Sequence, residues 1–284
     1  MADELLTARG IDLTYGGNRL FGGPGLKVLH GVDVTIGRGE TVGIVGESGS
    51  GKTTLGRALL RLVDVSAGEI RFDGRDITRA RDGQMRPLRR RMQMIFQDPM
   101  ASLNPRHSVR RILVEPILLH RLASNAGDAE ARVLKILDRF TLPRAVLDRN
   151  PHELSGGQRQ RIGIARTALL EPDFVLADEI VSGLDVSTQA QVLNLLRDLS
   201  RDMGLAMAFI SHDLSVIRAV CDRVYVMRLG KVVEEGRCED VFAAPKSEFT
   251  RALLDAIPLP EIDPGWLERK SPLEEAAAAE SLPP

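Results

Sequence analysis

The sequence predicts a mixed α/β fold, in which a parallel sheet with flanking helices forms the core. Three observations lead to this prediction. A short buried strand at 41–45 runs through a glycine-rich loop into a helix at 54–62. Apolar strands at 173–179 and 206–211 flank a helix at 187–203, which is the strand–helix–strand order of a parallel sheet. Segments of alternating polarity precede this core, and a helical segment interrupts it.

The segments outside the parallel core have their own patterns. Residues 5–40 alternate apolar and polar side chains in short runs, which predicts antiparallel strands, and 68–74 continues this pattern. Another strand is expected at 92–96. Proline and asparagine then appear, and helical patterns such as 131–140 predict a helical insertion over 98–150.

The end of the core is expected to be a hairpin at 224–235, with its turn at Leu229-Gly230-Lys231. The tail from about residue 258 is rich in proline, glutamate and alanine, and is expected to be mobile. The predicted division is an antiparallel β subdomain with the first part of the core at 1–97, a helical subdomain at 98–156, the second part of the core at 157–240, and a C-terminal extension at 241–284.

Composition limits the classes of function. The 284 residues carry a net charge of −1, so there is no electrostatic case for a nucleic acid partner, and the arginines at 86–91 predict a solvated helix face. Cys221 and Cys238 have neither disulfide-framework nor metal-site spacing. The acidic N-terminus lacks an apolar signal core, and no apolar run reaches the roughly 18 residues that span a bilayer. We expect a cytoplasmic protein that reaches a membrane only through a partner.

Residues 46–53 match the phosphate-loop pattern G-x-x-x-x-G-K-[ST] at every fixed position. The glycines let backbone N–H groups turn toward one anion, and the helix N-terminus adds its positive dipole end. Lys52 would reach the β- and γ-phosphates and Thr53 would bind Mg²⁺, which predicts a P-loop NTPase core of the RecA-like type. A glycine-rich turn without a ligand is the alternative, and the strand and helix around the loop disfavour it. The predicted nucleotide contacts are Gly46, Glu47, Ser48, Gly49, Ser50, Gly51, Lys52, Thr53 and Thr54.

The apolar strand at 174–178 ends in two carboxylates, Asp178 and Glu179. Sheets of this type place their sites at the carboxyl ends of strands. Asp178 would help to hold Mg²⁺, and Glu179 would polarise the attacking water as general base. Acidic turn residues alone would explain the pair, but beside a phosphate loop the catalytic interpretation is favoured.

Two further features have a plain and a functional interpretation. Leu154-Ser155-Gly156-Gly157-Gln158 precedes an amphipathic helix and predicts a second anion site, although an N-cap with turn glycines explains it equally simply. Tyr15 lies upstream of the phosphate loop, where its ring could stack on a nucleobase or serve as an ordinary strand aromatic.

The motifs and their order along the chain resemble those of the nucleotide-binding subunits of ATP-binding-cassette (ABC) transporters. The resemblance covers nearly the whole chain. The resemblance rests on the phosphate loop, Gln97, the signature at 154–158, the acidic strand, Ser182-Gly183-Leu184-Asp185 and His212. In that family two subunits face head to tail, and each ATP lies between the phosphate loop of one subunit and the signature of the other.

The resemblance implies further roles. Ser155 and Gly157 would contact the γ-phosphate held by the partner's phosphate loop, and Asp185 would report across the dimer. Gln97 would sense Mg²⁺ and the attacking water, while His212 would hold the γ-phosphate and the catalytic glutamate. The same comparison assigns the aromatic residue upstream of the loop, Tyr15, to adenine stacking.

The subgroup that the chain resembles is that of the dipeptide, oligopeptide, nickel and glutathione importers. The segments that indicate it are Phe96-Gln97-Asp98-Pro99, Ser102-Leu103-Asn104-Pro105 and Leu184-Asp185-Val186-Ser187. The implied activity is ATP hydrolysis that energises an importer from the cytoplasmic face of the membrane. The implied partners are a second ATPase subunit, transmembrane permease subunits and, indirectly, an extracytoplasmic substrate-binding protein.

Other functions stay open at this point. A soluble ATPase with the same cassette could serve an assembly or metabolic complex, for example in phosphonate metabolism, whereas a phosphate-loop kinase would not need the signature. Three departures from the family pattern stand out. Ile180 replaces the usual proline, Gly183 the usual alanine, and Lys246-Ser247-Glu248-Phe249 a His-Pro-Tyr run. The first two leave every catalytic group in place, and the third leaves the role of the C-terminal extension open.

Overall fold

The structure, a computed structural model, describes residues 3–16 and 25–256. Its centre is a six-stranded sheet in the order β10-β9-β3-β8-β7-β6. The neighbours β9, β3, β8, β7 and β6 run parallel, and β10 returns antiparallel to β9 as the predicted hairpin. The strands are β3 (Thr41–Val45), β6 (Met92–Ile95), β7 (Phe174–Asp178), β8 (Ala206–Ile210), β9 (Arg223–Arg228) and β10 (Lys231–Arg237).

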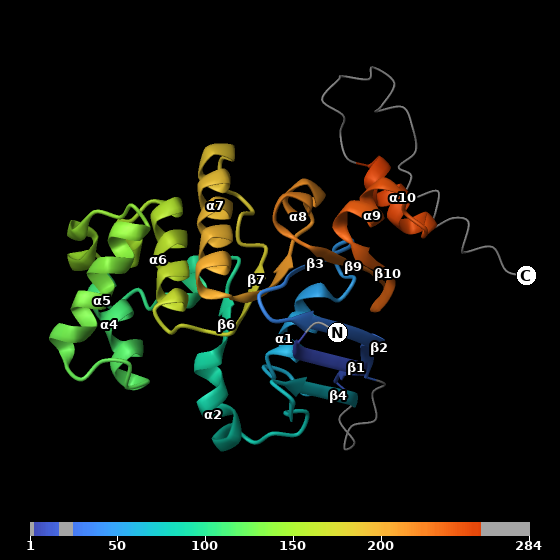
Figure 1. Cartoon of the computed structure of the whole chain (residues 1–284), viewed down its shortest axis with the longest axis horizontal. Helices are drawn as coiled ribbons and strands as arrows, with labels where there is room; N and C mark the ends of the chain where they lie inside the picture. The colour runs from blue at the N-terminus through green and yellow to red at the C-terminus, as the bar shows by residue number, and fades with distance from the viewer. Residues whose placement is uncertain (1–2, 17–24, 257–284) are drawn as a thin grey trace, which may run out of the picture.

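A second sheet is antiparallel and has the strand order β2-β1-β4-β5. It confirms the antiparallel strands expected from the early alternation of polarity. Its strands are β1 (Glu4–Tyr15), β2 (Leu26–Gly37), β4 (Ala67–Phe72) and β5 (Arg75–Asp76). In Figure 1 this sheet lies below the central sheet, with α1 between the two.

Helices cover the rest of the central sheet. Figure 1 shows α4 and α5 on the side away from the antiparallel sheet, with α6 and α7 between them and the strands. The helices are α1 (Lys52–Leu59), α2 (Asp82–Arg91), α3 (Pro99–Ser102), α4 (Val109–Leu119), α5 (Ala126–Arg139), α6 (Gly156–Ala168), α7 (Val186–Met203), α8 (Leu214–Val220), α9 (Cys238–Ala243) and α10 (Glu248–Asp255), with short 3₁₀ turns η1 (Arg144–Asp148) and η2 (Pro151–Glu153).

The predicted mixed α/β fold is confirmed. Helices α3 to α5 lie where the helical insertion was predicted. The domain boundaries at 97/98, 156/157 and 240/241 stay predictions, and the tail beyond residue 256 lies outside the described residues. Within residues 3–16 and 25–256, none of the helices combines the length and the apolar character needed to cross a bilayer.

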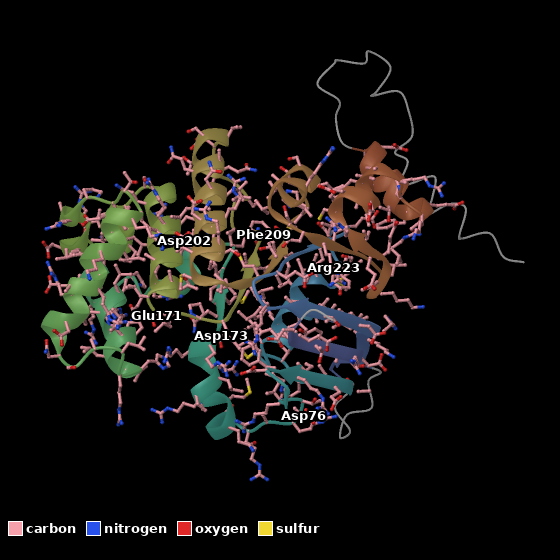
Figure 2. All side chains as sticks on the ribbon, in the orientation of Figure 1. Asp76, Glu171, Asp173, Asp202, Phe209 and Arg223 are labelled. Carbon is pink, nitrogen blue, oxygen red and sulfur yellow. The ribbon has the colours of Figure 1, made fainter. Side chains whose placement is uncertain are left out.

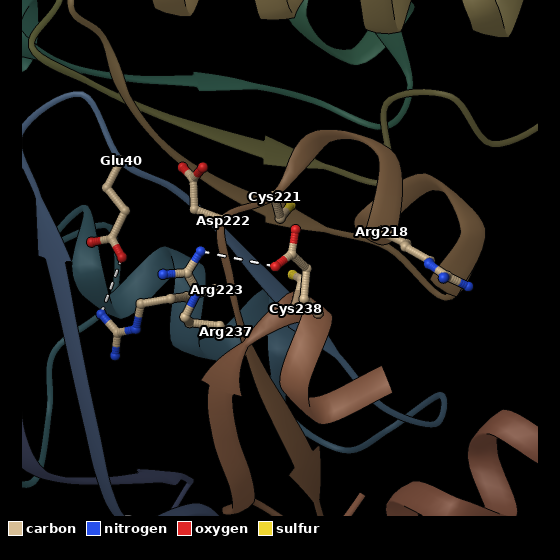
Figure 3. Close-up of a pocket in the computed structure, with 8 residues that line it drawn as sticks. Glu40, Arg218, Cys221, Asp222, Arg223, Arg237 and Cys238 are labelled. Atoms are coloured by element: carbon tan, nitrogen blue, oxygen red, sulfur yellow. Dashed lines mark hydrogen bonds and ion pairs between the residues drawn. The ribbon is translucent and has the colours of Figure 1, made fainter. Parts of the chain in front are cut away.

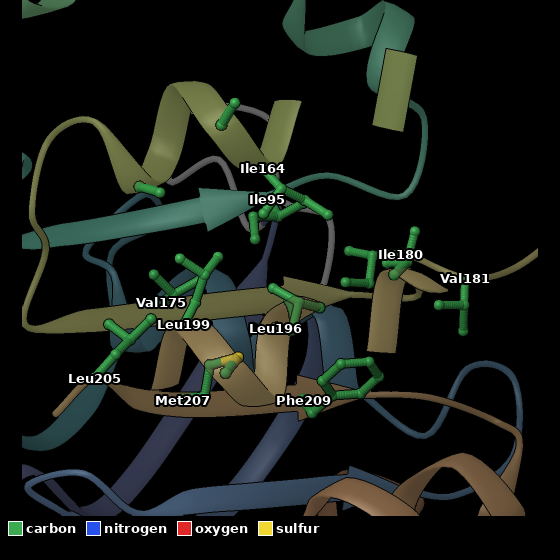
Figure 4. Packing of buried hydrophobic residues seen from close by; sticks show 14 of the residues in the cluster. Ile95, Ile164, Val175, Ile180, Val181, Leu196, Leu199, Leu205, Met207 and Phe209 are labelled. Carbon is green, nitrogen blue, oxygen red and sulfur yellow. The ribbon is translucent and has the colours of Figure 1, made fainter. Parts of the chain in front are cut away.

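Two apolar clusters hold the layers together. One fills the space between the central sheet and the helices, and Figure 4 shows Leu196 and Leu199 of α7 beside Met207 and Phe209 of β8. The other joins the antiparallel sheet and α1 to the opposite face of the central sheet, and includes Phe72. Full burial of one such side chain stabilises the fold by roughly 1.5–3 kcal/mol. Because many such side chains pack between the layers, the two clusters fix the strands, and with them the strand ends, in place.

Charged side chains lie mainly on the outside, as Figure 2 shows. Arg132 of α5 pairs with Glu171 (3.1 Å) and Arg139 of the same helix pairs with Asp202 of α7 (2.6 Å). Exposed pairs of this kind contribute about 0–1 kcal/mol each. They orient α5 against its neighbours, whereas the apolar clusters supply most of the stability.

Candidate active site

The site is built at one edge of the central sheet. Strands β3, β8, β7 and β6 are parallel neighbours, so their carboxyl ends meet there. Each of these strands is followed by a predicted site residue or loop: the phosphate loop after β3, His212 after β8, Glu179 after β7 and Gln97 after β6. Strand order therefore gathers residues that are far apart in the sequence.

The phosphate loop depends on glycine at particular positions. Gly46, Gly49 and Gly51 have φ of 145°, 82° and 99°, and a Cβ at Gly46 would lie 2.1 Å from the carbonyl oxygen of Met227. Among the described residues, the Ser50 hydroxyl oxygen is buried and has no hydrogen-bond partner. A tight concave loop with an unsatisfied buried hydroxyl at a helix N-terminus fits an anionic ligand.

Lys52 lies inside this loop with only 6% of its surface exposed. Its Nζ donates to the carbonyl oxygens of Gly46 and Glu47, both at 2.7 Å. Burial lowers the pKa of Lys52, while Glu179 and Asp178 oppose that shift. Two of its three donors go to neutral carbonyls, which leaves the buried positive charge for an anion such as a phosphate to balance.

Thr53 and Asp178 bring a hydroxyl and a carboxylate together. Thr53 Oγ1 donates to Asp178 Oδ1 at 3.1 Å. Burial raises the pKa of Asp178, and the hydrogen bond from Thr53 acts in the opposite direction. Oxygen donors of these two types are those that Mg²⁺ takes beside nucleotide phosphates, so the residues present fit the predicted ion.

Glu179 lies beside two of the other predicted catalytic residues. Gln97 Nε2 donates to Glu179 Oε2 at 3.1 Å, and His212 Nδ1 lies 3.7 Å from Glu179 Oε1. A cavity of about 140 Å³ adjoins this carboxylate, and Ser182 and Gly183 form part of its wall. The carboxylate is thus oriented beside a space large enough for water, as a general base requires.

The predicted signature forms the start of α6. Ser155 Oγ accepts the N–H of Gln158 (3.3 Å), and Gln158 Oε1 accepts the N–H of Ser155 (3.1 Å), which is a reciprocal capping box. Ser155 and Gly156 are exposed. A Cβ at Gly157 would lie 2.8 Å from Thr188 Cγ2, so the signature lies against the start of α7.

Asp185 is the N-cap residue of α7. Its carboxylate accepts the N–H of Thr188 (2.9 Å), the hydroxyl of Thr188 (2.7 Å) and the hydroxyl of Ser187 (2.8 Å). These hydrogen bonds, the Thr188 amide first, lower the pKa of Asp185 to about 2. Among the described residues, no hydrogen bond or ion pair joins Asp185 or the signature to the phosphate loop. One chain therefore carries two separate groups of predicted site residues.

Tyr15 ends β1 with 41% of its surface exposed, and its register partner on β2 is the exposed Leu26. An exposed aromatic and aliphatic pair of this kind suits the face of a nucleobase. No local sequence pattern identifies Leu26, because only the pairing of β1 with β2 brings it beside the tyrosine.

The two departures near Glu179 have different surroundings. Ile180 is 1% exposed and belongs to the cluster that contains Phe209 (Figure 4), so its side chain has an apolar packing site. Gly183 has φ of 76°, and a Cβ there would meet nothing within 4 Å. Glycine at 183 thus relieves backbone strain in a turn and does not make room for a neighbour.

A pocket of about 580 Å³ lies between the start of β9 and the start of α9, and Figure 3 shows its lining. Two ion pairs lie in its wall: Glu40 with Arg223 (3.1 Å) and Arg237 with Glu239 (4.0 Å). Burial raises the pKa of Cys238, which lines the same pocket, to about 11. None of the predicted site residues lines this pocket, so it is separate from the candidate active site.

Comparisons with known proteins found a matching family and several related proteins. The family described as ABC transporter matches residues 29–182. A Brucella ovis protein, provisionally named a peptide import ATP-binding protein, is 55% identical over 238 residues, which cover 84% of this chain and 75% of that protein. The oligopeptide transport ATP-binding protein OppF of Streptococcus mutans is 45% identical over 258 residues, or 91% and 83% of the two chains.

Among solved structures, a dimeric ATP-binding cassette in a post-hydrolysis state with ADP and Pi has a TM-score of 0.75 and 28% identity. The match covers 82% of this chain and 99% of that one. The family match includes the phosphate loop, the signature and the acidic strand, and spans more than half of the 284 residues. The chain therefore belongs to the ABC transporter family, as one of its ATP-hydrolysing subunits.

Proposed function

We propose that this chain couples ATP hydrolysis to the import of peptides through a membrane permease. The observation that carries the hydrolytic part is the Glu179 carboxylate, which accepts a hydrogen bond from Gln97 and lies beside His212, at the sheet edge that also bears the phosphate loop. The names of the relatives, which are peptide and oligopeptide import ATP-binding proteins, support the peptide cargo.

The proposed chemistry assigns a task to each group. The loop amides and Lys52 hold the β- and γ-phosphates. Thr53 and Asp178 would hold Mg²⁺, with Gln97 nearby, and the bound ion would supply positive charge beside the phosphate oxygens. Glu179 takes the proton of the attacking water, while His212 orients both that carboxylate and the γ-phosphate.

The second group of residues would serve the nucleotide of a partner subunit. Ser155, Gly157 and Asp185 lie at the starts of α6 and α7 and have no direct link to the loop of their own chain. A head-to-tail dimer would bring them to the partner's γ-phosphate, and the dimeric form of the related cassette supports this arrangement. Closure with ATP and opening after hydrolysis would then drive a permease from the cytoplasmic face.

Glu179→Gln tests the hydrolytic assignment. The amide keeps the size of the side chain but cannot accept the proton, so ATP binding should persist while turnover falls about 10²–10⁴-fold. Closed dimer should accumulate in the presence of MgATP, which sedimentation can measure. Normal turnover in this variant would rule out Glu179 as the base.

Glu171→Gln is the matched control. Glu171 is also a glutamate with positive φ (50°, against 48° at Glu179). It is exposed and pairs only with Arg132 within the described residues. We expect this variant to hydrolyse ATP at the wild-type rate, which separates loss of the base from the effect of the substitution itself.

The transport assignment needs its own test, because a soluble complex was the alternative. We expect the chain to co-purify from membranes with a permease, and its ATPase activity in vesicles to rise when a peptide-loaded binding protein is added. Association with a soluble enzyme complex, and no response to peptide, would contradict peptide import while leaving ATP hydrolysis in place.

A further inference from the structure

The phosphate loop rests on a turn that comes much later in the chain. Between β9 and β10, Leu229 and Gly230 form a two-residue hairpin turn. The N–H of Gly230 donates to the carbonyl oxygen of Ser50 in the loop at 3.0 Å, and the carbonyl oxygen of Gly230 accepts the N–H of His30 on β2 at 2.9 Å. The turn thus ties the back of the phosphate loop to the antiparallel sheet.

The backbone of this turn admits little change. Leu229 and Gly230 have φ of 46° and 77°, the pair of positive values found in a type I′ turn. A Cβ at Gly230 would lie 2.1 Å from the carbonyl oxygen of Val28 and 2.7 Å from the His30 ring. The nearer of these atoms is backbone, so any side chain at 230 must move the turn away from β2 and would disturb its hydrogen bond to Ser50.

The bond to Ser50 also sets the direction of the next amide. In a trans peptide the C=O of one residue and the N–H of the following residue point in opposite directions. The carbonyl of Ser50 points back to the turn, and so the N–H of Gly51 points away from it, at the N-terminus of α1 where an anion binds. Loss of the bond would free this peptide to rotate.

We propose that Gly230 is a positioning residue for ATP: it holds the Ser50–Gly51 peptide in the orientation that binds phosphate, without touching the nucleotide. A second contact supports the same arrangement. The carbonyl of Met227, just before the turn, closes against Gly46 at the other end of the loop. The end of β9 and its turn therefore support both ends of the loop.

Gly230→Ala tests this proposal. The KM for ATP and the Kd for MgADP should rise about tenfold, as expected for the loss of one well-placed hydrogen bond. The kcat at saturating ATP should fall by less than KM rises. A variant that was merely less stable would instead lose kcat with its folded fraction and keep KM.

Gly74→Ala is the matched control. Asp73 and Gly74 also form a two-residue hairpin turn, between β4 and β5, with φ of 52° and 71°. A Cβ at Gly74 meets nothing within 4 Å, so this variant carries the same backbone strain without a clash. Its KM should match the wild type, and equal KM values for Gly74→Ala and Gly230→Ala would overturn the proposal.

Hydrogen exchange of the wild-type protein decides the question if Gly230→Ala does not fold. Peptides that cover 229–231 should gain protection when MgADP binds to the monomer, and peptides that cover 73–75 should not. Equal response of the two turns would overturn the proposal. The inference rests on the phosphate-loop assignment, which Lys52→Ala tests separately in the same titration: normal nucleotide binding by that variant would remove the assignment itself.

Discussion

At the scale of single residues, the site shows a conflict between stability and function. Asp178 is 6% exposed, and burial raises the pKa of its carboxyl group above 3.8. Desolvation makes the ionised form unfavourable in the absence of a cation. The same ionised form is the one that would help to hold Mg²⁺. The proposed function would therefore require a charge that the fold alone does not favour.

Asp178→Asn should make the protein without nucleotide more stable at neutral pH. The folded-state pKa of Asp178 is raised above the unfolded value of 3.8. The carboxyl group therefore stabilises the folded state fully only below pH 3.8, and this contribution is lost as pH rises through the folded-state pKa. The variant does not titrate, so its advantage should grow as pH rises from 4 and then level off. Thermal unfolding of both proteins between pH 4 and 8 measures this difference.

The control for this measurement is Asp202→Asn, which removes an exposed carboxylate that pairs with Arg139. Its stability should change little, by about 1 kcal/mol at most. An Asp178→Asn variant no more stable than the wild type at pH 7 would contradict the account of a buried, desolvated carboxylate.

At the scale of elements, the C-terminal extension is attached to β10 by a buried carboxylate. Glu234 accepts the N–H groups of Lys246 (2.8 Å) and Ser247 (3.1 Å), which lie at the start of α10. Phe249 is 3% exposed, and the guanidinium of Arg228 lies 4.9 Å from its ring centre. The segment that departs from the family pattern thus forms the attachment of α10.

Glu234→Ala should loosen α10 without removing catalysis. The change leaves two backbone N–H groups without their acceptor, at about 1–3 kcal/mol for a buried group. Exchange of the α10 amides and proteolysis near residue 248 should both become faster, while ATPase activity persists. The matched control is Glu235→Ala, the exposed neighbour on the same strand, and equal protection of α10 in both variants would refute this role.

The attachment should also depend on pH. Burial works against ionisation of Glu234, but hydrogen bonding, with the Lys246 amide as its largest contributor, outweighs burial and lowers the pKa of the carboxyl group below 4.5. A lowered folded-state pKa means that the stabilisation is present above the unfolded value and is lost as pH falls through the folded value. The α10 amides should therefore lose protection on acidification below about pH 4.5 in the wild type, and much less in Glu234→Ala.

At the scale of the whole molecule, the chain carries two groups of predicted site residues, and within the described residues no hydrogen bond or ion pair joins them. The phosphate loop and its catalytic residues lie at the edge of the central sheet, and the signature lies with Asp185 at the starts of α6 and α7. A ligand that needs both groups has to bind between two chains. This arrangement makes ATP itself a component of the proposed dimer interface.

Mixing two inactive variants tests that arrangement. Lys52→Ala damages the loop and Ser155→Arg damages the signature, so each protein alone should be inactive. In a mixed dimer one pocket contains both defects, but the other combines the intact loop of one chain with the intact signature of the other. ATPase activity should reappear on mixing. A mixture as inactive as its components would show that each pocket lies within one chain.

The sequence by itself determined the local structures and the class of chemistry. Glycine positions, apolar runs and helix caps act over a few residues. They predicted the loop at 46–53, the apolar strands of the core and the turn at 229–231. The fold class and the family followed from the order of these motifs. The roles of the individual site residues, including Tyr15 and Ser155, stay predictions.

Only the tertiary structure decided which distant residues meet. The contacts of Gln97 and His212 with Glu179, of Gly230 with Ser50, and of Glu234 with the start of α10 join segments that no local pattern relates. They depend on the order β10-β9-β3-β8-β7-β6 in one sheet, and the burial of both faces of that sheet stabilises this order. Burial is a property of the assembled layers, and a sequence pattern specifies which face is apolar but not what it packs against.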